Sequence, residues 1–301
     1  LIEGAEFTLD TALDPGAGTV DSVGVAYKEL TADVVAGDTL LLNDGLLVLE
    51  VLELRGGRIR TRVAVGGELS NRKGVNRKGG GISAPALTDK DREDIRFVAA
   101  QGADYVALSF VRDAEDIHLA RRLLREAGGG DVRIVAKIER HEAVAQLTGI
   151  IDAADALMVA RGDLGVEMGY AALTGLQKNI IRQARHRNRV VITATQMMES
   201  MIQSPVPTRA EVSDVANAVM DGTDAVMLSA ETAAGKHPVK AVAAMADVIV
   251  GAESYQITQH RPRERAGVIF TQTEEAIANA VMYTANHMSV RAIVALTESG
   301  A

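Results

Sequence analysis

The sequence predicts an α/β fold in which short buried strands alternate with helices, and three observations indicate this. First, apolar stretches recur from about residue 84 onward, at Tyr105–Val111, Val132–Ile138, Ala156–Ala160, Val190–Ala194 and Ala225–Leu228. Second, helical patterns lie before and between them, among them Lys90–Gln101, Ala114–Ala127 and Leu176–Arg187. Third, the strands are almost continuously apolar, which is typical of a parallel sheet buried on both faces. Such repeated units fit an α/β barrel or a doubly wound sheet.

The first 83 residues or so predict a separate, small β-rich module. Short apolar stretches at Thr39–Leu42, Leu46–Leu52 and Ile59–Val65 are separated by glycine and aspartate, which favours strands joined by tight turns. The module ends in the segment Asn71–Gly81, where glycines alternate with unpaired cations. This composition is typical of a flexible hinge.

The last part of the chain predicts the beginning of a third domain. A helix at Glu274–Asn286 precedes a strand at Ala292–Leu296, which reads as α/β material that stops at Ala301. The expected domains are therefore residues 1–83, 84–255 and 256–301. Five strands do not close an eight-stranded barrel, so either the sheet is open or strands are missing upstream. Both ends of the chain look cut.

Composition limits the possible partners. The 301 residues are 47% hydrophobic, enough for a sizeable core and for more than one domain. The formal net charge is −8 and the pI is near 5.4, so nucleic acid and anionic membranes are not indicated as partners. The chain has no cysteine, which excludes disulfides and fits a cytoplasmic protein. No apolar run approaches the roughly 20 residues of a membrane span, and no signal peptide is visible.

Polar residues follow the predicted strands, at the edge of a parallel sheet where active sites form. Lys137 and Glu139 are two residues apart and therefore share a face at the end of their strand. Asp163 follows the next strand between Gly162 and Gly165, and Thr195 follows the one after. Each feature also has an ordinary interpretation, as a strand-end ion pair, a Gly-Asp loop or a strand-end hydroxyl.

Taken together, these residues indicate chemistry on a phosphorylated or enolic substrate. The carboxylates of Glu139 and Asp163 supply the oxygen ligands that Mg²⁺ prefers. Lys137 beside them neutralises charge on a transferring phosphoryl group. The same set would suit a metal-assisted aldolase or lyase that acts on a pyruvate enolate.

Six segments of the chain resemble the pyruvate kinases. They are residues 134–139 (IVAKIE), 158–167 (MVARGDLGVE), 194–201 (ATQMMESM), 207–211 (PTRAE), 214–224 (DVANAVMDGTD) and 229–232 (SAET). Their order and spacing also match, and the resemblance covers nearly the whole chain. It implies an incomplete (β/α)8 TIM barrel with an inserted small β-barrel lid domain and the start of an α/β C-terminal domain. It also implies transfer of phosphate from phosphoenolpyruvate to ADP, giving pyruvate and ATP.

The resemblance assigns roles residue by residue. Lys137 resembles the catalytic lysine that stabilises the phosphoryl group, and Glu139 and Asp163 match the ligands of Mg²⁺ or Mn²⁺. Asp163 is also expected to contact the substrate. Gly162, through its N–H, and Thr195 match contacts to the substrate carboxylate, and Thr195 also lies where the enolate is protonated. The Thr208–Glu211 segment has a structural interpretation instead, as a capping box at a helix start.

Two residues of the N-terminal module also have counterparts in the family. Lys73 matches a lysine that touches the nucleotide phosphates, although it also reads as one solvated cation among neighbours. Asp44 resembles an aspartate of the lid that helps to close over the nucleotide. The chain departs from the family pattern at Lys78, where a proline is common, and at Asn43, where the family has an aspartate.

The resemblance also indicates what residues 1–301 lack. The first three barrel strands, with the ligands of K⁺, and most of the C-terminal domain are expected outside this chain. A homotetramer is usual in the family. Two rival interpretations are a Mg²⁺-dependent lyase of the pyruvate or phosphoenolpyruvate barrel type, which would have no nucleotide lid, and a non-catalytic fragment or binding module.

Overall fold

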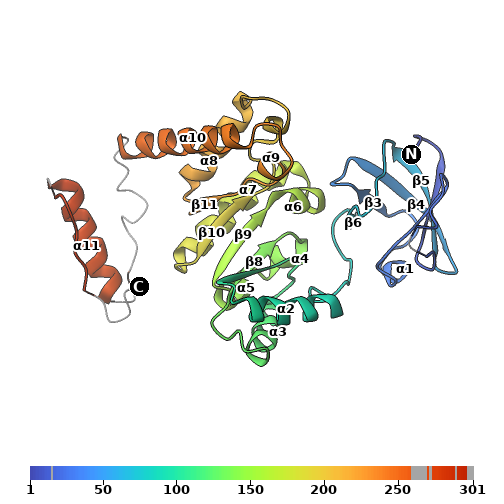
Figure 1. Cartoon of the computed structure of the whole chain (residues 1–301), viewed down its shortest axis with the longest axis horizontal. Coiled ribbons are helices and arrows are strands. Elements are labelled where there is room, and N and C mark those ends of the chain that lie inside the picture. The colour runs from blue at the N-terminus through green and yellow to red at the C-terminus, as the bar shows by residue number, and fades with distance from the viewer. Residues whose placement is uncertain (15, 259–269, 271–272, 289, 297–301) are drawn as a thin grey trace. The chain divides into compact units, whose positions relative to one another are not determined.

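A computed structural model describes residues 1–14, 16–258, 270, 273–288 and 290–296 of the chain (Figure 1). The chain divides into two compact units, Leu1–Ala252 and Glu253–Ala301. The larger unit contains two sheets with separate hydrophobic cores, and the smaller unit contains the end of α10 (Pro238–Thr258) and α11 (Thr273–His287).

The N-terminal module is a curled, six-stranded sheet with the strand order β2-β1-β5-β4-β3-β6 (Figure 1). All neighbouring strands are antiparallel except β1 and β2. The elements are β1 (Glu6–Asp10), β2 (Ser22–Gly24), α1 (Leu30–Asp33), β3 (Thr39–Leu42), β4 (Leu47–Arg55), β5 (Arg58–Val65) and β6 (Val75–Arg77). Buried and exposed residues alternate along β5, as expected for a sheet with one face on a core.

Part of the segment expected to be a hinge is a strand. Within Asn71–Gly81, β6 pairs with β3, so that Leu40 lies opposite Arg77 and Leu42 opposite Val75. The backbone of these residues is therefore tied into the sheet by its hydrogen bonds. Glycines with positive φ follow directly, at Gly79, Gly80 and Gly81, and leave the chain free to turn towards the second sheet.

The second sheet is parallel and has the strand order β11-β10-β9-β8-β7. Its strands are β7 (Tyr105–Leu108), β8 (Arg133–Ile138), β9 (Ala156–Ala160), β10 (Val190–Ala194) and β11 (Ala225–Val226). Each strand lies beside its neighbour in sequence. A doubly wound sheet would reverse this order at a switch point. The uninterrupted order is that of consecutive strands in a partial α/β barrel.

Helices connect the parallel strands. They are α2 (Asp89–Gln101), α3 (Ala114–Glu126), α4 (His141–Ala145), α5 (Leu147–Ala153), α6 (Arg161–Met168), α7 (Tyr170–His186), η1 (Glu199–Ile202), α8 (Arg209–Asp221), α9 (Ala230–Ala233) and α10 (Pro238–Thr258). All residues of β9 are buried, as a central parallel strand requires. The predicted capping box at α8 is confirmed, since Thr208 and Glu211 bond reciprocally to each other's main-chain N–H.

Two sequence-based expectations differ from the structure. The Gly-Asp loop expected after β9 is a helix, since α6 begins at Arg161 and places Asp163 in its first turn. The strand expected at Ala292–Leu296 is wrong, because these residues have no regular structure. An apolar stretch becomes a strand only where a second strand supplies its hydrogen bonds. Among the described residues, none pairs with this stretch.

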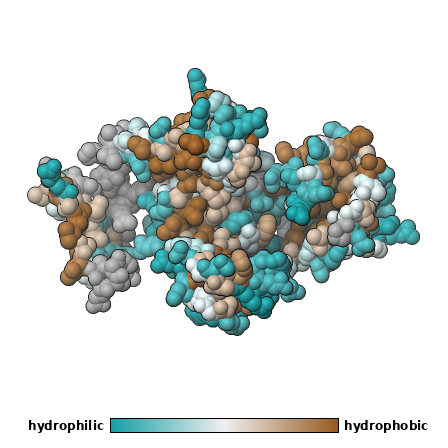
Figure 2. All heavy atoms as spheres, viewed as in Figure 1, coloured by the Kyte–Doolittle hydropathy of each residue, from teal (hydrophilic) through white to brown (hydrophobic). Residues whose placement is uncertain are grey.

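The surface of α10 is partly apolar. Val239, Val242 and Val250 are exposed on this helix, and hydrophobic surface is visible in this part of the molecule in Figure 2. Within the described ranges, no helix combines the length and the apolar character needed to cross a bilayer.

Candidate active site

Lys137 and Glu139 are joined at the end of β8. Because β8 alternates its side chains, both point to one side, and Lys137 Nζ lies 2.6 Å from Glu139 Oε1. Lys137 Nζ also donates to Ser109 Oγ at 2.9 Å, and the N–H of Phe110 donates to Glu139 Oε2 at 2.6 Å. Glu139 is buried. The lysine is therefore held by two acceptors, one charged and one neutral, at the carboxyl end of the sheet.

Asp163 lies in the first turn of α6, which follows β9 without a loop. Burial, together with the negative charges of Glu139 and Asp44, raises the pKa of Asp163 to about 6, against the opposite effect of Lys137. Among the described residues, no side chain or N–H group forms a hydrogen bond or ion pair with this carboxylate. Asp163 is thus a buried carboxylate with negative charges nearby and, among the described residues, no hydrogen-bond donor or counter-ion bound to it.

Thr195 and Gly162 are hydrogen-bonded to each other across the ends of β10 and β9. The N–H of Gly162 donates to Thr195 Oγ1 at 2.8 Å, and the hydroxyl of Thr195 donates to the oxygen of Ala194 at 2.6 Å. The two groups that the sequence assigned to the substrate carboxylate therefore lie together. In this structure the Gly162 N–H bonds to the hydroxyl.

Asp44 of the N-terminal module approaches the same region. It sits between β3 and β4 in a turn where Asn43, Asp44 and Gly45 all have positive φ. The hydroxyl of Tyr170, at the start of α7, donates to the oxygen of Asp44 at 3.3 Å. The charge of Asp44 also contributes to the raised pKa of Asp163. Asp44 therefore lies on the side of its module that contacts α7, and its expected role towards the nucleotide remains a proposal.

Lys73 is not brought into this group. Its side chain is exposed, and no hydrogen bond or ion pair joins it to another of the described residues. The ordinary interpretation, a solvated cation on the module's surface, describes it as it stands here. Its expected contact with nucleotide remains a proposal.

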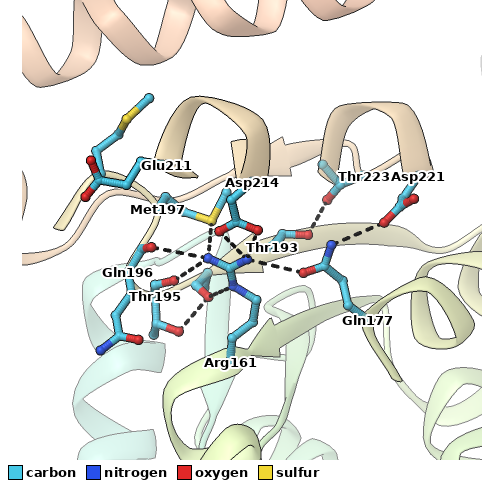
Figure 3. Close-up of polar contacts among 12 residues, drawn as sticks. Arg161, Gln177, Thr193, Thr195, Gln196, Met197, Glu211, Asp214, Asp221 and Thr223 are labelled. Carbon is cyan, nitrogen blue, oxygen red and sulfur yellow. Dashed lines mark hydrogen bonds and ion pairs between the residues drawn. The ribbon is translucent and has the colours of Figure 1, made fainter. Parts of the chain in front are cut away.

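Several residues of the site carry no role in the sequence-based interpretation. Ser109 accepts from Lys137, and Arg161 reaches the turn that holds Thr195 (Figure 3). Glu231 is buried and accepts the N–H groups of Met198 and Ser229, which joins the segments after β10 and β11. Arg161 and Glu231 stand inside the segments that resemble the family, so the signal was present, but Thr195, which Arg161 contacts, and Met198, which Glu231 contacts, lie more than thirty residues away in sequence.

The carboxylates of the site are too few to enclose a metal ion by themselves. Among the residues that the structure describes, no three acidic, histidine or cysteine side chains cluster closely enough to hold one. Glu139 and Asp163 offer oxygen donors at neighbouring strand ends, and other ligands would have to be water or substrate.

Comparison with known proteins identifies the family. The sequence profile described as "Pyruvate kinase, barrel domain" matches residues 1–242. The chain belongs to the pyruvate kinase family. It is 58% identical to "Pyruvate kinase II" of Salmonella typhimurium and 55% identical to "Pyruvate kinase" of Haemophilus influenzae, in each case over 99% of its length. It is 47% identical to "Pyruvate kinase" of Geobacillus stearothermophilus over 94% of its length.

The chain covers only part of those relatives. It spans 62% of the Salmonella protein, 63% of the Haemophilus protein and 49% of the Geobacillus protein. The family match confirms the fold class predicted from the sequence, an incomplete α/β barrel with an inserted β module.

Proposed function

We propose that this chain contains the central part of a pyruvate kinase, which transfers the phosphoryl group of phosphoenolpyruvate to ADP and yields pyruvate and ATP. The observation that supports it best is the position of Lys137, held by Glu139 and Ser109 beside Asp163. A fixed cation next to carboxylates suits phosphoryl transfer, which depends on positioning and on stabilising charge. The relatives named pyruvate kinase match almost the whole chain.

The proposed cofactor is Mg²⁺ or Mn²⁺, held by Glu139 and Asp163. The residues fit such an ion, because Asp163 has a raised pKa and lacks a partner among the described residues. A divalent cation prefers oxygen ligands. It would also offset the repulsion between the carboxylate of Asp163 and the negative charges of Glu139 and Asp44. When bound, it neutralises the charge of the phosphoryl group. K⁺ is a second proposed cofactor, whose ligands lie outside residues 1–301.

The remaining residues bind and orient the substrate. Lys137 places its ammonium group where charge accumulates on the phosphoryl group in transit, and this favours the transition state over the bound substrate. Gly162 and Thr195 present an N–H and a hydroxyl for the substrate carboxylate. When the substrate binds, it competes for the hydrogen bond that now joins these two groups. Thr195 also lies where a proton is delivered to the enolate.

The proposed domains are a lid at residues 1–83, a partial barrel at 84–255 and the start of a C-terminal domain at 256–301. Closure of the lid would exclude water, which otherwise competes as phosphoryl acceptor. The hydrogen bond from Tyr170 to the oxygen of Asp44 is consistent with a lid that meets the barrel at this point. Lys73 would then meet the nucleotide phosphates. We place the enzyme in the cytoplasm as a homotetramer, by analogy with the family.

A direct assay tests this function. Pyruvate formation from phosphoenolpyruvate is measured with and without ADP and Mg²⁺, in the complete natural protein that carries this sequence. The proposal requires pyruvate only when both are present, and a stoichiometric yield of ATP. A lyase would convert its substrate without ADP, and a binding module would convert nothing. The Glu139→Gln variant should lose the activity, whereas Asp155→Asn, at the opposite end of the sheet, should keep it.

A further inference from the structure

The turn after β10 holds two successive residues in the left-handed backbone conformation. The φ angle is 71° at Thr195 and 53° at Gln196. For a residue with a Cβ atom this region is sparsely populated, and a β-branched residue there is an outlier. Such a residue is strained and persists only where its surroundings hold it. Contacts around Thr195 must therefore stabilise this turn.

One guanidinium group supplies these contacts. Arg161 Nη2 donates to the oxygen of Thr195 at 2.8 Å and to that of Gln196 at 3.4 Å, while Nε donates to the oxygen of Ala194 at 3.3 Å (Figure 3). Main-chain oxygens of successive residues in an extended strand point in opposite directions. One side chain can reach all three because the left-handed residues turn them to the same side.

Arg161 is itself anchored from the other side. Its Nη1 atom donates to Asp214 of α8 at 2.7 Å and to Gln177 of α7 at 3.4 Å (Figure 3). Gln177 in turn donates to Asp221 at 3.2 Å. Arg161 is buried, and a buried cation is stable only with a counter-ion and satisfied hydrogen bonds. The position of the guanidinium is therefore set by two helices that do not contain it.

The hydroxyl of Thr195 is held by the residue next to Arg161. Gly162 donates its N–H to Thr195 Oγ1, so the first turn of α6 holds Thr195 at two points, the main-chain oxygen and the hydroxyl. Asp163 follows in the same turn. A displacement of Arg161 would move the hydroxyl of Thr195 away from the N–H of Gly162 and so away from the turn that carries Asp163.

We infer that Arg161 is a positioning residue of this site and that Asp214 keeps it in place. Arg161 holds the Thr195–Gln196 turn so that the hydroxyl of Thr195, the N–H of Gly162 and Asp163 keep one arrangement. Lysine cannot replace it, because an ammonium group is a point charge, whereas the planar guanidinium has five donors in a fixed fork. The consequence for catalysis rests on the proposed function, whereas the consequence for the conformation of Thr195 does not.

Methyl NMR of threonine-labelled protein tests the conformation. The complete natural protein is used, and the Thr195 methyl signal is assigned by its loss in Thr195→Ser. We expect Arg161→Lys and Asp214→Asn to shift this signal more than that of Thr61, which lies in the other sheet. Asp155→Asn is the matched control, since it removes an Arg–Asp pair at the far end of the strands whose aspartate is partly exposed, as Asp214 is. An unmoved Thr195 signal in both variants, or an equal shift in Asp155→Asn, would overturn the inference.

Kinetics test the consequence for the reaction. Arg161→Lys should lower kcat about 10- to 100-fold and leave Mg²⁺ affinity unchanged, because a small displacement of a positioned group has effects of this size. Combining it with Thr195→Ser should lower kcat no further than the stronger single change. Independent, multiplying effects would overturn the inference. If Arg161→Lys does not fold, Asp214→Asn decides both measurements. A wild-type protein without kinase activity overturns the proposed function alone, and the methyl spectra then decide this inference.

Discussion

The ammonium group of Lys137 lies 2.6 Å from Glu139, and the other oxygen of Glu139 accepts the N–H of Phe110. Glu139 thus joins two neighbouring strand ends, β8 and β7, while it orients the lysine. The carboxylate is shared between holding the cation and, on the proposed function, binding a metal ion. A substitution of Lys137 should therefore affect mainly kcat, whereas a substitution of Glu139 should also affect the affinity for Mg²⁺.

Lys137→Met should lower kcat far more than it changes the KM for phosphoenolpyruvate. The charge is proposed to act on the phosphoryl group in transit, and loss of one such group typically costs about 10²–10³ in kcat. Steady-state kinetics of the complete protein separate the two constants. Lys178→Met, which removes an exposed lysine paired with Asp221, serves as the control. A change confined to KM would make Lys137 a binding residue.

Glu139→Gln and Asp163→Asn should each weaken Mg²⁺ binding at least about tenfold, because each removes one of the two anionic oxygen ligands that we propose for the ion. Isothermal titration with Mg²⁺, or with Mn²⁺ as a spectroscopic probe, measures the affinity. Asp155→Asn provides a carboxylate change outside the site. Wild-type affinity in both site variants would refute the assignment of these residues as ligands.

Asp163→Asn should stabilise the metal-free protein although it impairs the metal site. Burial and the charges of Glu139 and Asp44 raise the pKa of Asp163 to about 6, so the ionised form that predominates at neutral pH is less favourable in the folded chain than in the unfolded chain. An uncharged amide removes that repulsion, with an expected gain of about 1 kcal/mol. Thermal unfolding in the presence of a chelator measures the difference. A lower Tm for the variant would contradict this prediction, because it would mean that the ionised carboxylate of Asp163 is stabilised in the metal-free protein.

Lys73→Ala should weaken nucleotide binding and leave phosphoenolpyruvate binding nearly unchanged. Lys73 is exposed in this structure, so its contribution is expected only when the lid closes on nucleotide phosphates. Titration with ADP and Mg²⁺ measures the affinity, and Lys78→Ala is a control from the same segment. A fluorophore pair on lid and barrel reports closure. If the distance between the two fluorophores does not change and Lys73→Ala binds ADP as tightly as the wild type, the N-terminal module does not close on nucleotide. That result would favour the interpretation as a lyase.

Asp116→Asn should destabilise the protein at neutral pH and less so in acid. Burial acts to raise the pKa of Asp116, but hydrogen bonds from the side chain and N–H of Arg112 lower it below its usual value of 3.8. A lowered pKa means that the stabilisation is complete above about pH 4–5 and is lost as pH falls through the folded-state pKa. We expect a loss of about 2 kcal/mol at pH 7.

Denaturant unfolding between pH 7 and pH 3 measures the Asp116 effect. The difference between wild type and variant should be constant from pH 7 to about pH 5 and should shrink below it. Asp89→Asn is the control, because Asp89 is exposed and lies 4.0 Å from Arg92, a surface pair of little expected value. A difference that grows in acid would contradict the assigned direction of the pKa shift.

Local sequence patterns were enough to predict much of the fold and the core of the site. Apolar runs located β9 and β10 to the residue, and the capping box located the start of α8. The two-residue period of a strand placed Lys137 beside Glu139. These features depend on neighbours within a few residues, which the sequence displays directly. The family motifs added the roles that we propose for Gly162, Asp163 and Thr195.

Only the tertiary structure decided the features that join distant segments. The guanidinium of Arg161 donates to three main-chain oxygens that lie 33 to 35 residues away in sequence. No local sequence pattern predicts these contacts. The raised pKa of Asp163 depends on its burial and on the charges of Glu139, which follows β8, and of Asp44, in the turn between β3 and β4. The apolar stretch Ala292–Leu296 is not a strand, because a ladder needs a partner as well as a pattern. Periodicity reports what a segment can form, whereas long-range contacts determine which conformation and which charge state it adopts.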